Sequence, residues 1–213
     1  LSTVLWLLTT LYAIGYLENA PHRSRFFGFF SLCVSATLGI ALAGNLFTFF
    51  AFYELLTLAT YPLVMHRGTP EARRAGRIYL GYTLAGGLAL LFGMVWLHHL
   101  LGGPVAFTPG GVVTPGMAPD AVLIAIFALL VGGLGVKAAL VPLHGWLPIA
   151  MVAPAPVSAL LHAVAVVKAG AFGIVRVVLD VYGVDTAAAL GVTQVLAVLA
   201  AFTILYGSVR ALF

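Results

Sequence analysis

Residues Gly135–Gly170 read GVKAALVPLHGWLPIAMVAPAPVSALLHAVAVVKAG, and this stretch decides the fold. It is mostly apolar, yet it contains two lysines, two histidines and four prolines. Each proline removes a backbone N–H and clashes with the preceding helical turn. A helix that breaks just after Lys137, near Pro142, is therefore predicted, with residues 143–151 apolar enough for a short second half-helix. Broken backbone at membrane depth is tolerated in a protein interior or a water-lined cavity. An ordinary loop is the alternative, and it is a serious one for residues 152–156.

The composition places the chain in a lipid bilayer. Hydrophobic residues make up 62% and charged residues 8% of the 213 positions, with a mean hydropathy of +1.13, which is too little polar surface for a soluble globule. A bilayer-crossing helix needs about 20 apolar residues. The apolar runs show no alternation of the kind found in membrane β-barrels, so we expect an all-α membrane protein. About seven crossings are predicted, at approximately Leu1–Leu17, Phe27–Gly44, Asn45–Met65, Ile78–Leu101, Ala121–Val141, Val157–Asp180 and Thr186–Gly207.

The arginines predict the orientation. They follow the first, third and seventh runs, which share one side if every run crosses, and short loops rich in arginine usually stay cytoplasmic. We therefore expect a multi-pass protein of the cell (inner) membrane with cytoplasmic arginine loops. The net charge of +4 is a topology signal and gives no indication of nucleic-acid binding. The loop arginines are Arg23, Arg25, Arg67, Arg73, Arg74, Arg77 and Arg210.

Other signals limit the chemistry. The chain starts at Leu1 without a basic segment, so we expect no cleavable signal peptide and an excerpt of a longer protein. Cys33 is the single cysteine, which excludes an internal disulfide and offers no metal cluster. The sequence has no glycine-rich nucleotide loop and no haem attachment motif. We expect a non-redox transport subunit without cofactor or metal, and leave open whether it serves an enzyme complex.

One deep acid, Glu54, and both lysines of the chain, Lys137 and Lys168, lie within apolar runs. Such a residue costs about 2.5–3.5 kcal/mol on insertion scales, so it usually faces a protein interior or water and has a use. Lys168 lies roughly 16 Å along the sixth run at 1.5 Å per residue, and Glu54 is similarly deep in the third. A buried carboxylate beside an ammonium keeps both charged, so a Glu–Lys pair whose distance changes is a proton switch in principle. For Lys137 the alternative is snorkelling to the interface.

Two histidines flank the predicted break. His144 and His162 are plausible proton relays because imidazole titrates near neutrality, although a packed core imidazole is an equal alternative. His162 and Lys168 are six residues apart and point in different directions on a helix, so water would have to bridge them. His98 and His99, at the end of a run, are interpreted as interfacial.

The motifs GVKAALVPLHGWLP, APAPVSALLHAVAVVKAG and GIVRV, with YELLTLATYPLV upstream, closely resemble the antiporter-like membrane subunits of respiratory complex I (NADH-quinone oxidoreductase) and of multisubunit Mrp-type Na⁺/H⁺ antiporters. Energy-converting hydrogenases share this family. The resemblance implies that Glu54 and Lys137 are the paired residues of the proton channel, that Lys168 is the central lysine and that His162 is a nearby relay. It implies as partners other membrane subunits, the lipid bilayer, and protons, with Na⁺ as an alternative ion.

The same resemblance implies a domain plan and shows two departures. Residues 28–180 would form the first five-helix repeat of an inverted-repeat transporter, with a flanking helix and cytoplasmic loop at 1–27 and the start of the next repeat at 181–213. Many relatives have a polar residue, often aspartate, where this chain has Ile149. The second repeat is missing from the sequence, so the chain could hold an uptake half-channel without completing translocation alone.

The predicted function is proton translocation. A proton enters from the cytoplasmic side through water near the break and is held at Lys137 while Glu54 is close. It is released when Glu54 is drawn away, and passes His144 and His162 to Lys168. One alternative is a structural subunit whose buried charges only hold helices together. A further alternative is a helical bundle whose histidines ligate haem.

Overall fold

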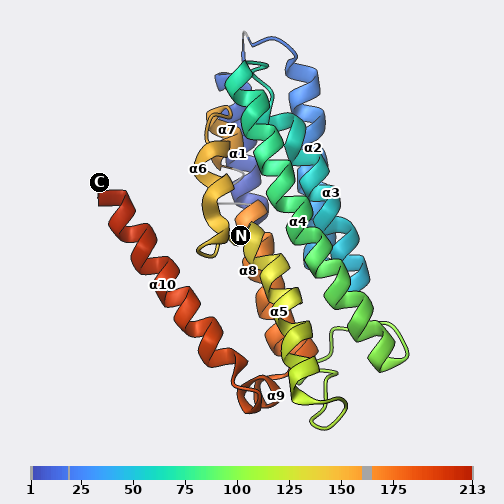
Figure 1. The fold of residues 1–213 in the computed structure, drawn as a ribbon. Coiled ribbons are helices and arrows are strands. Elements are labelled where there is room, and N and C mark those ends of the chain that lie inside the picture. Colours follow the sequence, from blue (N-terminus) through green and yellow to red (C-terminus); the bar gives the residue numbers. More distant parts are fainter. Residues whose placement is uncertain (1, 19, 160–164, 213) are drawn as a thin grey trace.

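The computed structural model describes residues 2–18, 20–159 and 165–212, which form helices joined by loops and contain no β-strand (Figure 1). Five described helices are long and apolar enough to cross a membrane, and they correspond to the second, third, fourth, fifth and seventh predicted runs. A multi-pass all-α membrane fold is thus confirmed, whereas seven full-length crossings are not. The five helices are α2 (Arg23–Leu42), α3 (Leu46–Val64), α4 (Pro70–Leu101), α5 (Asp120–Lys137) and α10 (Val192–Leu212).

The first and sixth runs form shorter pieces. The first is α1 (Ser2–Tyr16), whose apolar part is below the length of a full crossing. The sixth contains α7 (Ala155–Ala159), α8 (Val166–Arg176) and the π-helical segment η3 (Val177–Tyr182), followed by α9 (Val184–Ala189). Ala165, with φ −122° and ψ −71°, is not helical, so a full-length crossing over this run is not confirmed.

Helices α2 to α5 lie side by side, and α8 packs along α5 (Figure 1). Glycines allow the closest approach between α4 and α5. A Cβ on Gly133 would lie 2.5 Å from the Gly86 carbonyl oxygen, and a Cβ on Gly86 would lie 2.9 Å from the Gly133 carbonyl oxygen. Small residues at such positions let membrane helices pack backbone to backbone. The backbones of α4 and α5 are therefore in close contact at Gly86 and Gly133.

The predicted break is present at the end of α5. The helix ends at Lys137, and Ala139 has a left-handed φ of +57°. The chain then forms a single turn, η1 (Leu143–Gly145), and the short helix α6 (Trp146–Ala150), which corresponds to the expected second half-helix. The fully buried Trp146 fixes α6 by donating a hydrogen bond of 2.7 Å from Nε1 to the Val136 carbonyl oxygen. The two halves are thus joined across the break.

Helix α10 stands apart from the bundle in Figure 1, and most of its side chains are exposed. It meets the broken segment at one polar contact, where the Val141 N–H donates to Thr203 Oγ1 at 3.1 Å. A cavity of about 380 Å³ lies between α10 and the break, and its lining includes His144 and Arg210. The break therefore opens toward α10.

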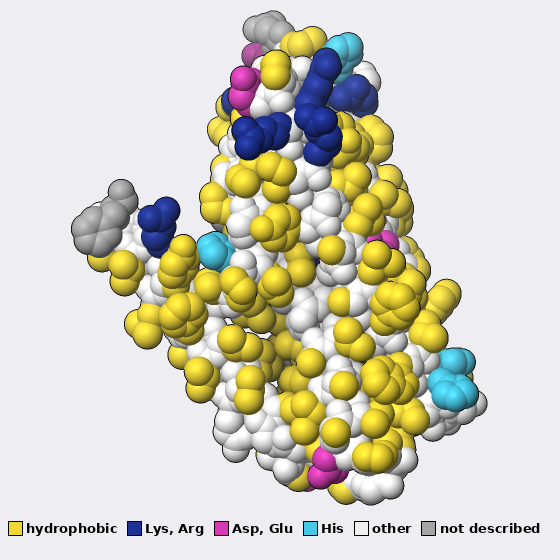
Figure 2. All heavy atoms as spheres, viewed as in Figure 1, with side chains coloured by type: hydrophobic (Ala, Val, Ile, Leu, Met, Phe, Trp, Pro, Cys, Tyr) yellow, Lys and Arg dark blue, Asp and Glu magenta, His cyan; other side chains and the backbone are white. Residues whose placement is uncertain are grey.

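Charged side chains are segregated along the membrane axis. Figure 2 shows lysine and arginine side chains gathered at the end where α2 and α4 begin, while apolar side chains cover the length of the bundle. The arginines near the start of α2 and α4 thus share one end of the molecule, whereas Arg210 lies in the last turn of α10, apart from them.

Candidate functional site

Lys137 and Glu54 form an ion pair between α5 and α3. The Lys137 side chain is 1% exposed, and its Nζ lies 4.0 Å from Glu54 Oε1. The same ammonium donates to the Tyr53 carbonyl oxygen and lies 3.3 Å from the centroid of the Tyr53 ring, a cation–π geometry. The end of α5 is therefore attached to Tyr53 and Glu54 of α3 by an ion pair, a hydrogen bond and a cation–π contact.

The Glu54 carboxylate is only partly satisfied. Its side chain is 19% exposed, and its buried Oε1 has no hydrogen-bond donor among the described residues. Gly87 of α4 faces it, and a Cβ at that position would lie 2.6 Å from Oε1 and 2.9 Å from Cδ. The carboxylate thus occupies a notch that exists because residue 87 has no side chain. Helix α4 helps to set how near Glu54 lies to Lys137.

This arrangement can hold and release a proton. Two unit charges 4 Å apart attract each other by about 4 kcal/mol at an effective dielectric constant of about 20. A change in the distance between Glu54 and Lys137 therefore strongly changes how firmly the lysine holds its proton. Lysine and glutamate both change protonation readily when their surroundings change, unlike arginine. The pair sits at a broken helix inside an apolar bundle, a setting in which membrane transporters place their sites.

His144 lies in η1 and faces α10. Its ring packs edge-on against Tyr206 with centroids 5.1 Å apart, and its buried Nδ1 has no hydrogen-bond partner within the described chain. No hydrogen bond joins it to Glu54 or Lys137 among the described residues. His144 therefore lines the cleft beside the break and is separate from the ion pair.

Lys168 is not brought to the pair. Lys168 lies in the first turn of α8, is exposed, and has no acidic partner in the part of the chain that the structure describes. His162 lies outside the described residues. Of the two lysines considered as partners for Glu54, Lys137 is the one within ion-pair distance. His98 and His99 are exposed in the last turn of α4, at the end of the bundle opposite the arginines, as expected for interfacial side chains.

Sequence reasoning missed the neighbours that shape the pair. Tyr53 contributes a carbonyl and a ring to Lys137, and Gly87 makes room for Glu54. An aromatic residue directly before a deep acid, and two adjacent glycines inside an apolar run, were the available signals. Glycine inside a membrane helix usually indicates close approach of another group.

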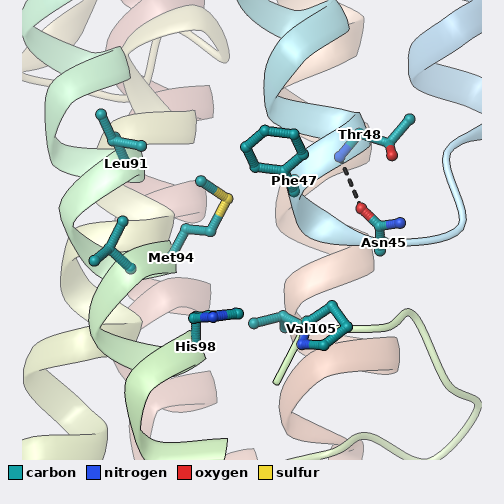
Figure 3. A pocket seen from close by; sticks show the side chains of 9 residues that line it. Asn45, Phe47, Thr48, Leu91, Met94, His98 and Val105 are labelled. Carbon is teal, nitrogen blue, oxygen red and sulfur yellow. Dashed lines mark hydrogen bonds between the residues drawn. The ribbon is translucent and has the colours of Figure 1, made fainter. Parts of the chain in front are cut away.

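A separate cavity of about 430 Å³ lies between the start of α3 and the later part of α4 (Figure 3). Phe47, Leu91 and Met94 contribute apolar surface, and Asn45 caps α3 by accepting from the Thr48 N–H at 2.8 Å. His98 is the ionisable residue in its lining. Neither Glu54 nor Lys137 lines this cavity, so we assign the ion pair, not the cavity, as the candidate site.

Comparisons with known proteins give a consistent result. Residues 43–213 match the family described as "NADH:quinone oxidoreductase/Mrp antiporter, TM". The chain is 34% identical over 212 residues to NADH-quinone oxidoreductase subunit N of Desulforudis audaxviator, covering 97% of this chain and 41% of that protein. It is also 34% identical over 171 residues to Na⁺/H⁺ antiporter subunit A1 of Staphylococcus haemolyticus, covering 80% of this chain and 21% of that protein.

Solved structures agree. A chain of respiratory complex I from Thermus thermophilus aligns with a TM-score of 0.75 at 26% identity, covering 99% of this chain and 44% of that one. A chain of the Mrp complex from Dietzia sp. aligns with a TM-score of 0.69 at 31% identity, covering 78% of this chain and 18% of that one. The sequence thus spans less than half the length of these relatives.

Proposed function

Because this chain belongs to the NADH:quinone oxidoreductase/Mrp antiporter membrane family, we propose that it forms part of a proton-translocating subunit that works inside a multisubunit membrane complex. The resemblance read from the sequence motifs is thereby confirmed at family level. The observation that carries the proposal is the buried Lys137–Glu54 pair, 4.0 Å apart, at the point where α5 breaks.

In the proposed mechanism Lys137 holds a proton while the Glu54 carboxylate occupies the notch at Gly87. Movement of Glu54 away from the ammonium removes an attraction of about 4 kcal/mol at a dielectric constant of about 20. The proton then leaves Lys137 and passes through the region of His144 and His162 toward Lys168, and onward into the rest of the subunit. The transported ion is H⁺, with Na⁺ as an alternative partner in exchange.

The arginine-rich end is proposed to face the cytoplasm, because arginine loops resist translocation during insertion. Residues 28–180 are proposed to be the first of two inverted repeats, and other membrane subunits are proposed to supply the driving force. On this orientation the Lys137–Glu54 pair takes up protons from the cytoplasmic side. We propose the cell (inner) membrane as its location.

The proposal is tested with the full-length protein in its complex, sealed in vesicles. Glu54→Gln and Lys137→Met should lower proton transport by about tenfold or more, which corresponds to a barrier increase of about 1.4 kcal/mol. Asp120→Asn is the matched control, because it neutralises an exposed carboxylate in the first turn of α5. Normal transport in both Glu54→Gln and Lys137→Met, at matched assembly, would show that the pair is not a channel element.

A structural role is the second candidate, and one observation favours it. The Lys137 ammonium bonds to the Tyr53 carbonyl and so ties α5 to α3 directly. If this is its whole function, the two neutral variants will lose assembly and thermal stability in proportion to transport. Loss of transport with unchanged assembly supports the channel instead.

A further inference from the structure

Buried hydroxyls gather between α3 and α4, on the arginine side of Glu54. Thr57 and Thr60 follow Glu54 along α3 at about 4.5 Å and 9 Å of helix rise, and both are fully buried. Tyr79 of α4 is also fully buried, and it lies between Gly76, which faces Tyr61 and Met65 at the end of α3, and Gly87, which faces Glu54. Few buried polar side chains occur elsewhere in the described bundle.

The buried threonine hydroxyls have hydrogen-bond partners, but the Tyr79 hydroxyl has none among the described residues. Thr60 Oγ1 donates to the Leu56 carbonyl at 2.7 Å, and Thr57 Oγ1 donates to the Tyr53 carbonyl at 3.4 Å, as hydroxyls in membrane helices often do. Their oxygens can still accept. The Tyr79 hydroxyl, in contrast, has no hydrogen-bond partner among the described residues. A buried hydroxyl left unsatisfied costs about 1–3 kcal/mol, so a retained one calls for a functional reason.

The ring of Tyr79 is held by the broken segment. It packs against Trp146 with centroids 5.3 Å apart and an interplanar angle of 62°. Trp146 in turn bonds to the Val136 carbonyl, directly before Lys137. The orphan hydroxyl is therefore fixed in place by the element that positions the ion pair.

A cavity lies at the arginine end of the same interface. It measures about 370 Å³ and is lined by Tyr61, Met65, Arg73 and Arg77. The Met65 side chain fills the space that Gly76 leaves on α4, with Sδ 2.9 Å from where a Cβ would lie. This flexible side chain therefore lies between the cavity and α4.

We propose that protons reach Glu54 from the arginine end through the hydroxyls of Tyr79, Thr60 and Thr57, by way of water held between them, instead of through water near the break in α5. This inference rests on the proposed function and names its uptake route. Buried water typically makes two to four hydrogen bonds, and the free Tyr79 hydroxyl and the unpartnered Glu54 Oε1 offer a donor and an acceptor for it. In each transfer an incoming proton binds the phenol oxygen while the phenol O–H proton moves to the next water, so Tyr79 ends unchanged.

The test uses Tyr79→Phe, which removes the hydroxyl and keeps the ring against Trp146. Proton transport by the full-length complex in vesicles should fall by about tenfold or more, with unchanged assembly. Hydrogen–deuterium exchange of the Glu54 carboxyl group, followed by infrared spectroscopy, should slow to a similar extent. A purely structural hydroxyl would leave this exchange rate unchanged.

Tyr182→Phe is the matched control. Its hydroxyl donates to the Leu123 carbonyl at 2.7 Å, so this variant loses a formed hydrogen bond, yet it should transport normally. Tyr79→Phe with normal transport and exchange, beside a failing Glu54→Gln, overturns the route and leaves the proposed function standing. Slowed exchange of the Glu54 carboxyl group in His144→Gln, with normal exchange in Tyr79→Phe, assigns uptake to the break instead. Normal transport in Glu54→Gln itself overturns the proposed function.

Discussion

Substituting Gly87 by alanine should move Glu54 without touching either charge. The added Cβ would lie 2.6 Å from Oε1, whereas ordinary van der Waals contact begins at 3.4 Å, so the carboxylate must retreat by the difference of 0.8 Å. The atoms it displaces are the far end of a flexible side chain, so the helices need not separate. Alanine also favours a helix over glycine by about 0.8–1.0 kcal/mol, which protects assembly.

The expected size follows from the distance to Lys137. Retreat along the line from Nζ lengthens the separation from 4.0 Å to about 4.8 Å. At a dielectric constant of about 20 the attraction falls from about 4.2 to about 3.5 kcal/mol. The difference of about 0.7 kcal/mol corresponds to about a threefold change in the balance between paired and separated states.

Proton transport by the full-length complex in vesicles, normalised to assembled protein, is the assay. Gly87→Ala should change the transport rate about threefold. The rate should rise if release of the proton from Lys137 limits the cycle, and fall if holding the proton at Lys137 limits it. Gly81→Ala is the control, because it lies on the same helix with nothing within 4 Å of its Cβ. If Gly87→Ala and Gly81→Ala both match the unmodified protein, the separation of the pair does not govern transport and the reasoning is refuted.

Three further outcomes are expected. Gly170→Ala places a Cβ 2.7 Å from a backbone carbonyl oxygen of α5, so it should lower the thermal unfolding midpoint, whereas alanine at an open glycine should not. Trp146→Phe removes the hydrogen bond to the Val136 carbonyl and should cost about 0.5–1.5 kcal/mol in a denaturation assay; no loss would show that α6 is held otherwise. Burial first, and then the charge of Arg25, lowers the pKa of His66 below its ordinary 6.5. The folded state then binds fewer protons than the unfolded state, so stability should grow as the pH rises from the lowered pKa to about 6.5. Arg25→Gln should raise the pKa of His66 in an NMR titration.

The break in α5 could be predicted because its causes are local. Proline and glycine act through backbone geometry at their own positions, so the end of the helix at Lys137 follows from the residues around it. The apolar runs likewise predicted the crossing helices, since their length is set by the bilayer. The gathering of arginines at one end could be predicted because short loops rich in arginine stay on one side of a membrane.

Rotation about a helix axis could not be predicted in the same way. Counting along the sixth run placed Lys168 about 16 Å from the start of that run, whereas α8 begins at Val166 and leaves this lysine exposed. Its depth depended on a helix start that the run of apolar residues does not mark. The notch at Gly87 is equally non-local, because it depends on which face of α4 meets Glu54. Such contacts are set by packing between helices and not by sequence spacing.

Ending α5 at Lys137 also creates an electric field inside the bundle. A helix carries a partial negative charge of about half a unit at its C-terminus, and here that terminus lies inside the bundle, at the break after Lys137. Lys137 occupies the last turn, so this fixed partial charge stays near it even when Glu54 moves away, while its ammonium donates to the Tyr53 carbonyl of α3. The helix end supplies a constant counter-charge and Glu54 a variable one. The proton affinity of Lys137 can therefore switch between a higher and a lower value, and a partial counter-charge remains near the lysine in both.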